Sequence, residues 1–491
     1  MNVQRPDPGI QIDERTGVFI DNDWRAPVSG KTLDVVSPAT GAVITRIADG
    51  TVEDVDAAVA AARRAFEGDW GRLSALDRGR ILMRLGQLIL DNFEALALTE
   101  AADTGKPMKQ ARADITAAAR YFEFYGAAAD KVHGDTIPFM NGYFVATEYV
   151  PFGVTGHIIP WNYPAQMFGR TLAPALAMGN ATVIKPAEDA CLTSLRLVEI
   201  AREAGMPAGA INLVPGRGET AGAALSGHRG IDFISFTGSP EVGALVQISA
   251  ARNHIGCTLE LGGKSPQIVF ADADLDAALP VVLNAIVQNA GQTCSAGARV
   301  LVEASVAEAF VDRLRTEFSK LRAGTPEMDL NLGPLINESQ KRRVERFCSQ
   351  ALADGVPLIA EGAVHPDAPA AGYYVAPRVF GPVPPENALA HEEVFGPVLS
   401  LLTFADEAQA VALAEGTDYG LVAGVWSGDS ARAIRVARRM RVGQVFVNGY
   451  GAGGGIELPF GGMKKSGHGR EKGFAALREF AALRTMVVRH H

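Results

Sequence analysis

Cysteine is scarce and scattered in this sequence, which excludes two kinds of structural site. The four cysteines, at positions 191, 257, 294 and 348, form no Cys-x-x-Cys pair and no cluster. Disulfide frameworks and Cys-based zinc sites both depend on regularly or closely spaced cysteines. We therefore predict no disulfide framework and no metal site, and reduced thiols favour a cytoplasmic location.

Long apolar runs and an excess of positive charge are also lacking. No stretch approaches the roughly 18 apolar residues of a membrane-spanning helix, and residues 1–8 lack the apolar core of a secretory signal. The formal net charge of −9 argues against a nucleic-acid partner, because phosphate binding requires a basic face. The basic runs at 341–343 and 435–439 are predicted to lie on solvated helix faces.

What the sequence does have is length and apolar content. Its 491 residues exceed what one core usually organises, and 47% hydrophobic with 21% charged residues is typical of a folded globular protein. Two or three domains are expected.

Strand-like and helix-like segments alternate along most of the chain. From residue 151 onward the alternation predicts doubly wound parallel sheets in two α/β units. Before that point, a turn at 37–42 separates two short strands. The predicted helices span 51–66, 75–100, 114–128, 163–178, 192–203, 219–227 and 275–289, and the predicted later strands span 153–159, 181–186, 211–214, 231–236, 265–270 and 298–302.

Two segments interrupt this rhythm. Residues 131–150 alternate between polar and apolar side chains as a strand does, and residues 485–489 form a short apolar strand without a local partner. The C-terminal strand pairs either with 131–150 or with another subunit.

One cysteine and one glutamate stand out by the glycines around them. Cys294 follows Asn-Ala-Gly-Gln-Thr, and Glu260 precedes Leu-Gly-Gly-Lys. A thiol and a carboxylate on two glycine-bearing loops suit covalent catalysis, in which the thiolate attacks a carbonyl and the carboxylate activates the water that releases the product. On spacing alone the pair is a weak signal, since a lone cysteine is more often buried and inert.

Both residues belong to a series of seven motifs. Taken together, the motifs resemble the NAD(P)-dependent aldehyde dehydrogenase superfamily, in the family's order and over nearly the whole chain. One match could arise by chance, but an ordered set of seven is very hard to explain otherwise. The motifs are Pro160-Trp-Asn-Tyr-Pro, Lys185-Pro-Ala-Glu, Phe236-Thr-Gly-Ser-Pro-Glu-Val-Gly, Leu259-Glu-Leu-Gly-Gly-Lys-Ser-Pro, Gly291-Gln-Thr-Cys, Glu392-Glu-Val-Phe-Gly-Pro-Val and Pro459-Phe-Gly-Gly-Met-Lys-Lys-Ser-Gly.

The resemblance implies a fold of two doubly wound α/β domains plus a small β oligomerisation arm. The NAD-binding domain would comprise 1–130 and 151–262, and the catalytic domain 263–470. The arm would comprise 131–150 and 471–491, and a homodimer or homotetramer is implied.

The resemblance also implies the reaction, the oxidation of an aldehyde to its carboxylic acid. Cys294 would form a thiohemiacetal and then a thioester, which water activated by Glu260 would hydrolyse. The side-chain amide of Asn162 and the backbone N–H of Cys294 would stabilise the oxyanion. Glu471 matches a second family carboxylate with a proton-relay role, and its alternative is a solvated charge at a helix start.

For the cofactor, the resemblance favours NAD over NADP. Glu188 matches the residue that binds the adenosine ribose together with Lys185, and a carboxylate there would repel a 2′-phosphate. The implied cofactor residues are Ile159, Pro160, Trp161, Asn162, Lys185, Glu188, Gly218, Phe236, Ser239, Leu261, Gln340, Glu393 and Phe395.

In the substrate pocket, this chain has features of its own. Arg170 shares a predicted helix face with Tyr163 and Met167, and it stands where many simple-aldehyde oxidisers have an aromatic residue and succinic semialdehyde dehydrogenases have Arg. A cation in a roomy pocket predicts a semialdehyde or aromatic aldehyde with a polar or anionic tail. Alternatively, Arg170 pairs with a protein carboxylate. The implied pocket residues are Tyr163, Met167, Arg170, Gln288, Gly454 and Phe460.

Three other functions stay open at this point. A CoA-acylating semialdehyde dehydrogenase would typically lack the glutamate at 260. A non-catalytic binding protein on the same fold would not need the intact set of Cys294, Glu260 and Asn162. A cysteine hydrolase would need His157 or His254 beside the thiol.

Overall fold

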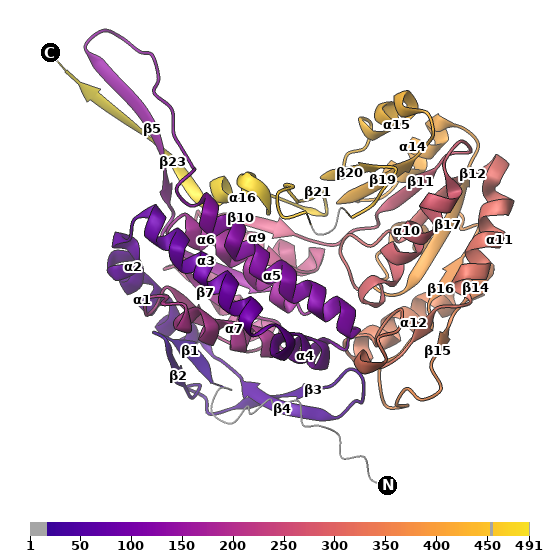
Figure 1. Ribbon diagram of the computed structural model, residues 1–491, viewed down its shortest axis with the longest axis horizontal. Coiled ribbons are helices and arrows are strands. Elements are labelled where there is room, and N and C mark those ends of the chain that lie inside the picture. The colour runs from indigo at the N-terminus through magenta and orange to yellow at the C-terminus, as the bar shows by residue number, and fades with distance from the viewer. Residues whose placement is uncertain (1–16, 452–454, 491) are drawn as a thin grey trace.

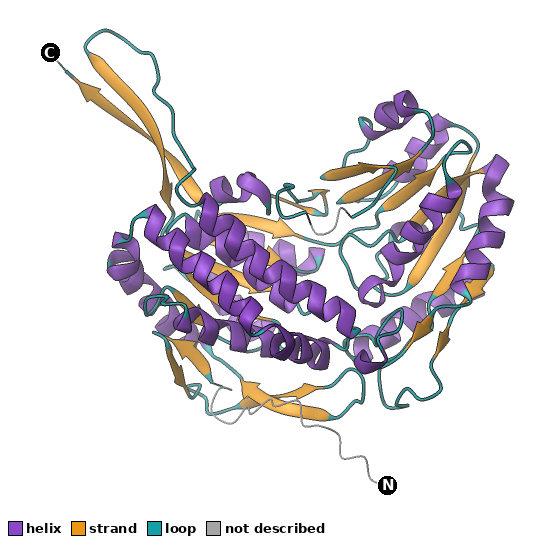
Figure 2. Ribbon diagram, viewed as in Figure 1, coloured by secondary structure: helices purple, strands orange, loops and turns teal. Residues whose placement is uncertain are grey.

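The chain folds into two α/β bodies and a projecting two-stranded β arm. The computed structural model describes residues 17–451 and 455–490. In Figure 1, the indigo to magenta N-terminal elements build one body and most of the orange elements build the other. Helices flank the sheets of both bodies (Figure 2), as the alternation of segments predicts.

Eight strands form the first sheet, in the order β2-β1-β8-β7-β6-β9-β10-β22. The strands from β8 to β10 run parallel, and the edges are extended by antiparallel pairing. The chain leaves β6 toward β8 and returns to β9 on the other side of β6, which creates a topological switch point where ligands bind in such sheets. The strands are β1 (Val18–Ile20), β2 (Asp23–Arg25), β6 (Val154–Ile159), β7 (Ala181–Pro186), β8 (Ile211–Leu213), β9 (Phe233–Thr237), β10 (Gly256–Glu260) and β22 (Gly467–His468).

Local sequence explains where several helices of this body begin and end. Asp54 closes a capping box at the start of α1 by accepting a 2.8 Å hydrogen bond from the N–H of Thr51. The single helix predicted over 75–100 is two helices, because Asn92 leaves helical geometry between them. The helices are α1 (Val52–Glu67), α2 (Asp69–Arg72), α3 (Ala75–Asp91), α4 (Phe93–Thr104), α5 (Met108–Ala128), α6 (Pro164–Ala177), α7 (Leu192–Glu203), the π-helical turn η1 (Gly218–Gly222), α8 (Ala223–Gly227), α9 (Pro240–Arg252) and α16 (Gly473–Glu479).

Seven strands form the second sheet, in the order β14-β16-β17-β12-β11-β19-β20, and only β14 pairs antiparallel. Alternate residues of β12 enter two apolar clusters, Leu301 on one face and Val300 with Val302 on the other. The strands are β11 (Pro266–Val269), β12 (Arg299–Glu303), β14 (Leu358–Glu361), β16 (Arg378–Phe380), β17 (Val398–Phe404), β19 (Val422–Trp426) and β20 (Gln444–Val447). The helices are α10 (Leu275–Val287), η2 (Gln288–Gly291), η3 (Ala304–Val306), α11 (Ala307–Phe318), η4 (Pro326–Met328), α12 (Glu338–Ala353), α13 (Ala388–His391), α14 (Glu407–Glu415) and α15 (Ser430–Ala437).

The two segments that interrupt the rhythm pair with each other. Strand β5 (Tyr143–Pro151) and strand β23 (Ala481–Arg489) form an antiparallel two-stranded arm that projects from the first body (Figure 1). The pairing of the C-terminal strand within the chain is therefore confirmed. The remaining short pairs are β3 (Thr32–Val36) with β4 (Val43–Ala48), β13 (Arg322–Ala323) with β15 (Ala363–Val364), and β18 (Tyr419–Gly420) with β21 (Met463–Lys464).

Near residue 470 the chain crosses between the bodies more than once. Strand β22 lies within the segment expected to be catalytic, but it pairs with β10 at the edge of the first sheet. Helix α16, expected in the arm, packs against α6 as well as β23. Among the described residues, no helix combines the length and apolar character needed to cross a membrane.

Candidate active site

Cys294 follows a strained turn at the end of α10. The helix predicted to reach residue 289 ends at Val287, because Asn289, Ala290 and Gly291 take φ values of 49°, 53° and 72°. Left-handed backbone is costly for a residue with a Cβ and persists only where the surroundings impose it. Here the Asn289 N–H donates to the Gln110 side chain over 3.1 Å.

Glycines allow the loops around the thiol to approach closely. A Cβ on Gly263 would lie 2.5 Å from the carbonyl oxygen of Cys294. A Cβ on Gly291 would lie 2.2 Å from the carbonyl oxygen of Gly396. Larger residues would push the Glu260 loop and the Cys294 loop apart.

Two cavities meet at Cys294. The first has a volume of about 160 Å³ and is lined by five of the six residues predicted for the substrate pocket. The sixth, Gly454, lies outside the described residues. The first cavity is lined by Tyr163, Gln166, Met167, Arg170, Gln288, Thr293, Cys294, Ser295, Val422, Gln444, Phe446, Tyr450, Gly451, Gly455, Leu458, Phe460 and Lys472.

Arg170 pairs with protein carboxylates. Its Nε lies against the carboxylate of Glu471, and its Nη2 lies 3.6 Å from Oε2 of Glu260. The guanidinium also stacks 4.4 Å from the centroid of the Phe460 ring. The structure therefore favours the alternative in which Arg170 serves the protein, although it also borders the substrate cavity.

The three paired groups are buried together, and burial governs their protonation. Burial raises the pKa of Glu260 well above its usual value, the neighbouring Glu471 raises it further, and Arg170 opposes both. Glu471 is fully buried rather than solvated, which excludes the alternative of an exposed charge at a helix start.

Burial also raises the pKa of the Cys294 thiol, to about 11, although Arg170 acts in the opposite direction. The thiol is therefore largely neutral at physiological pH and must lose its proton before it acts as a nucleophile.

Asn162 lies at the end of the loop between β6 and α6. Its side-chain amide donates to the carbonyl of Gln292 over 2.9 Å, next to the catalytic cysteine loop. Its own carbonyl accepts hydrogen bonds from the Asn289 amide (2.9 Å) and from the Lys106 ammonium (3.0 Å). The candidate oxyanion donor is thereby fixed to the loop that carries Cys294.

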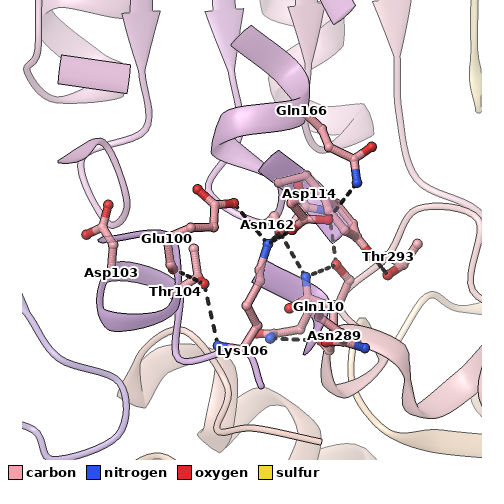
Figure 3. Close-up of polar contacts among 12 residues, drawn as sticks. Glu100, Asp103, Thr104, Lys106, Gln110, Asp114, Asn162, Gln166, Asn289 and Thr293 are labelled. Atoms are coloured by element: carbon pink, nitrogen blue, oxygen red, sulfur yellow. Dashed lines mark hydrogen bonds and ion pairs between the residues drawn. The ribbon is translucent and has the colours of Figure 1, made fainter. Parts of the chain in front are cut away.

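A buried ion cluster holds Lys106 in place (Figure 3). The ammonium donates to Glu100 over 3.1 Å and contacts Asp114, which also accepts a 2.6 Å hydrogen bond from Gln166 of the substrate cavity. It also lies 4.6 Å from the centroid of the Tyr163 ring. Burial lowers the pKa of Lys106, but Asp114 and Glu100 more than offset this effect and raise it above its usual value. Lys106 therefore stays charged.

The second cavity has a volume of about 420 Å³ and lies at the switch point of the first sheet. It contains seven of the residues predicted to bind the cofactor. It is lined by Pro160, Trp161, Asn162, Met167, Thr237, Gly238, Ser239, Pro240, Glu241, Glu260, Gly262, Cys294, Gln340, Arg343, Glu393, Phe395 and Tyr419.

Hydrogen bonds fix the wall of this second cavity. Gln340 donates to the carbonyl of Phe395 over 2.6 Å, which supports a positive φ of 59° at that aromatic residue. Glu393 accepts a 2.8 Å hydrogen bond from the N–H of Gly263, and a Cβ on Gly262 would meet its carboxylate at 2.2 Å. Burial raises the pKa of Glu393 to about 7.

Three further cofactor residues gather beyond the carboxyl end of β7. Glu188 accepts hydrogen bonds from Lys185 (2.6 Å) and from the N–H of Gly218 (3.1 Å). Burial alone would raise the pKa of Glu188, but these partners more than offset it and the pKa lies below its usual value. Ile159, Phe236 and Leu261 are buried beside the lining residues Pro160, Thr237 and Gly262 instead of facing the second cavity.

Neither candidate histidine lines either cavity with Cys294. His157 is buried in β6, where it bonds Thr155 over 2.8 Å and burial lowers its pKa to about 3. His254 is exposed in the turn after α9. A hydrolase built on either histidine is therefore not supported.

Sequence reasoning missed Lys106, Arg343 and Lys472. Arg343 donates to the carbonyl of Glu393 over 2.6 Å and borders the cofactor cavity. Its neighbours in sequence form a basic helical run, so only the fold distinguishes it. Lys472 directly follows Glu471, which was the one available signal.

Residues 24–486 match the Aldehyde dehydrogenase family. The chain belongs to this family. It is 41% identical to retinal dehydrogenase 2 of Homo sapiens over 489 residues, which cover 99% of this chain and 93% of the relative.

Solved aldehyde dehydrogenase structures superpose closely on the chain. A Burkholderia cenocepacia protein assigned as an aldehyde dehydrogenase is 61% identical with a TM-score of 0.96, covering 97% of this chain and 100% of that one. PnpE from Pseudomonas sp. WBC-3, in complex with nicotinamide adenine dinucleotide, is 38% identical with a TM-score of 0.94, covering 97% of this chain and 98% of that one. The protein is thus an NAD-dependent aldehyde dehydrogenase, and the predicted fold class, enzyme class and cofactor are confirmed.

Proposed function

We propose that this enzyme oxidises a small aldehyde with a polar or anionic tail to the carboxylic acid, by a hydrolytic mechanism. The observation that carries the proposal is the position of Cys294 at the junction of two cavities, with Glu260 lining the cofactor side. One cavity has the size and lining for a substrate, and the other holds most of the cofactor residues.

Cys294 and Asn162 act in the first half of the reaction. The Cys294 thiol releases its proton to solvent, and the thiolate sulfur forms a bond to the aldehyde carbon. The oxyanion of the resulting thiohemiacetal accepts hydrogen bonds from the Asn162 amide and the backbone N–H of Cys294. Bound NAD supplies the acceptor for the hydride that leaves this carbon.

Glu260 acts in the second half. It accepts a proton from water, whose oxygen attacks the thioester carbon, and passes that proton to the sulfur as the carbon–sulfur bond breaks, which gives the acid and the Cys294 thiol. Glu471 takes part through Glu260, because its charge raises the pKa of that carboxyl and makes it a stronger base. Arg170 balances both carboxylates.

A substrate of modest size fits the first cavity. A volume of about 150 Å³ is enough for benzene, so an aliphatic chain of a few carbons or one aromatic ring suits the roughly 160 Å³ cavity. Three glutamine amides and several hydroxyls in the lining favour polar groups on that chain or ring.

The site beyond β7 favours NAD over NADP. The lowered pKa keeps Glu188 ionised, and a carboxylate there repels a 2′-phosphate while it accepts hydrogen bonds from ribose hydroxyls.

The two-stranded arm of β5 and β23 is proposed to join subunits of a homodimer or homotetramer in the cytoplasm. An isolated pair of strands is marginally stable, and this arm exposes Phe144, Leu483 and Val487. Assembly would bury these side chains.

A CoA-acylating enzyme on the same fold is the second candidate, and Glu260 beside the thiol argues against it. A binding protein without catalysis is disfavoured because the thiol, the carboxylate and Asn162 occupy one site.

Paired variants test the mechanism. Cys294→Ala should abolish NADH formation while leaving the Kd for NAD nearly unchanged, because the thiol reacts with the substrate and does not bind the adenosine part of NAD. Glu260→Gln should give a burst of about one NADH per active site followed by slow turnover, because deacylation lacks its base. Full turnover in Cys294→Ala would overturn the mechanism. Rescue of Glu260→Gln by CoA, with acyl-CoA as product, would favour the second candidate.

A further inference from the structure

Lys472 lies in the wall of the substrate cavity with an unusual backbone conformation. Its φ of 62° and ψ of 165° fall in a region that glycine populates almost alone. The side chain nevertheless extends along the cavity wall, 5.2 Å from the centroid of the Phe460 ring.

Hydrogen bonds on both sides impose this conformation. Glu471 exchanges backbone hydrogen bonds of 2.7 and 2.6 Å with Phe460, and the N–H of Gly473 donates to the carbonyl of Ile456 over 2.7 Å. The hydroxyl of Tyr125 also donates to the carbonyl of Gly473 over 3.1 Å. A glycine at 472 would adopt the same geometry without strain, so the chain sustains the strain in order to present a lysine here. Strain of this kind gathers at binding sites.

The charges around the cavity point to what the lysine binds. Among the described residues that line it, Arg170 and Lys472 are the two cations, and none is an Asp or a Glu. Arg170 is balanced by Glu471 and Glu260. Burial lowers the pKa of Lys472 to about 7, with Arg170 adding to the effect. An anion in the cavity would favour the charged form of Lys472.

We propose that Lys472 selects substrates by charge, by binding the carboxylate tail of a small aldehyde whose carbonyl lies at Cys294. This rests on the proposed aldehyde oxidation and gives Lys472 the role that the sequence suggested for Arg170. An ammonium has three N–H donors, so Lys472 can bind a tail oxygen alongside its other contacts. The amides of Gln288 and Gln444 line the same cavity and provide donors for the second oxygen.

Two aldehydes of nearly equal shape test the proposal. The kcat/KM of the wild type for 4-formylbenzoate should exceed that for 4-methylbenzaldehyde. Lys472→Met should lower the ratio of kcat/KM for 4-formylbenzoate to kcat/KM for 4-methylbenzaldehyde by about 10- to 100-fold, mainly through a higher KM for the acid. Lys472→Arg should keep most of the ratio. Lys320→Met, which removes an exposed lysine in the turn after α11, is the matched control and should leave the ratio unchanged.

The alternative cation is tested in the same assay. Arg170→Met should slow the oxidation of both aldehydes alike, because it leaves two buried carboxylates without their partner. A ratio that collapses in Arg170→Met and persists in Lys472→Met would overturn the proposal.

A measurement that needs no turnover separates this proposal from the proposed function. Cys294 is alkylated with iodoacetate and with iodoacetamide, which differ in charge, and Cys294→Ala supplies the blank for the other thiols. Lys472→Met should lower the ratio of the iodoacetate rate to the iodoacetamide rate. The thiolate fraction cancels in this ratio, because it affects both rates equally. An unchanged ratio would overturn the proposal. If the wild type oxidises 4-methylbenzaldehyde without preferring the acid, the proposed hydrolytic oxidation of aldehydes stands, but the preference for an anionic tail and the role of Lys472 fall. If no aldehyde is oxidised, the proposed function falls, and the alkylation ratio alone decides on Lys472.

Discussion

At the scale of single residues, burial decides how the catalytic thiol responds to pH. The pKa of Cys294 is raised to about 11 by burial, so the fraction of thiolate is small at neutral pH and grows as pH rises toward that value. In the enzyme without NAD, the rate of Cys294 alkylation by iodoacetamide should therefore climb about tenfold per pH unit through the neutral and mildly alkaline range.

The measurement is the second-order rate at a series of pH values, with Cys294→Ala subtracted. A plateau near pH 8 would contradict this prediction, because it would mean a thiol with an ordinary or lowered pKa.

Single residues also show how far the sequence could predict the site. Cys294, Glu260 and Asn162 sit in ordered motifs, and the structure brings them together. The partner of Arg170 was left open, because Glu471 is remote in sequence and meets it only across the packed fold. Lys106 was missed for the same reason, because no local pattern distinguishes it from a surface lysine, whereas the one signal for Lys472 was its position directly after Glu471.

At the scale of elements, the segment between α4 and α5 positions the loop between β6 and α6. Replacing Lys106 with Met would leave Glu100 and Asp114 buried without their cation, and should cost about 3–5 kcal/mol of unfolding free energy. The Asn162 loop should also loosen, so kcat should fall while the Kd for NAD stays near the wild-type value.

Two further variants separate these effects. Adding Asp114→Asn to Lys106→Met should restore part of the stability, because one uncompensated charge is removed, but it should not restore kcat. The control is Lys109→Met, which removes an exposed lysine three residues further on, in the first turn of α5. Equal losses in Lys109→Met and Lys106→Met, measured by denaturant unfolding and steady-state kinetics, would contradict a positioning role.

The helices and strands that were predicted up to residue 302 were predictable because their apolar spacing matches their periodicity. Helix α7 over Leu192–Glu203 was expected at its observed ends. The failures share a cause: α10 ends early because the active-site turn holds Asn289 in left-handed geometry, and α5 begins at Met108, earlier than expected. At both ends tertiary contacts outweigh the local pattern.

At the scale of the whole molecule, the projecting two-stranded arm should control the assembly of subunits. Leu483 and Val487 lie on one face of β23 and are 58% and 55% exposed. Replacing both with Glu should shift a dimeric or tetrameric enzyme toward monomers, because charges would be buried in the interface between subunits. Analytical ultracentrifugation would measure the shift, with the equally exposed Leu352→Glu on α12 as control.

A monomeric wild type would overturn the assembly proposal. The two-stranded arm was predicted because its alternating pattern differs from that of its surroundings. The pairing of β22 with the first sheet was not predicted. A two-residue strand carries no periodicity, and only the return of the chain across the first body reveals it.

The pairing of β22 with β10 has a consequence for how the enzyme comes into being. Glu260 is paired with Gly467, so the strand that bears the catalytic base stays incomplete until residue 467 has left the ribosome. Arg170 likewise cannot pair with Glu471 until that residue has been made. A nascent chain can form most of the first sheet during synthesis, yet it gains a closed active site only after residues 467–471 have been added. Translation that stops before this segment leaves a protein with most of its first sheet and no working site.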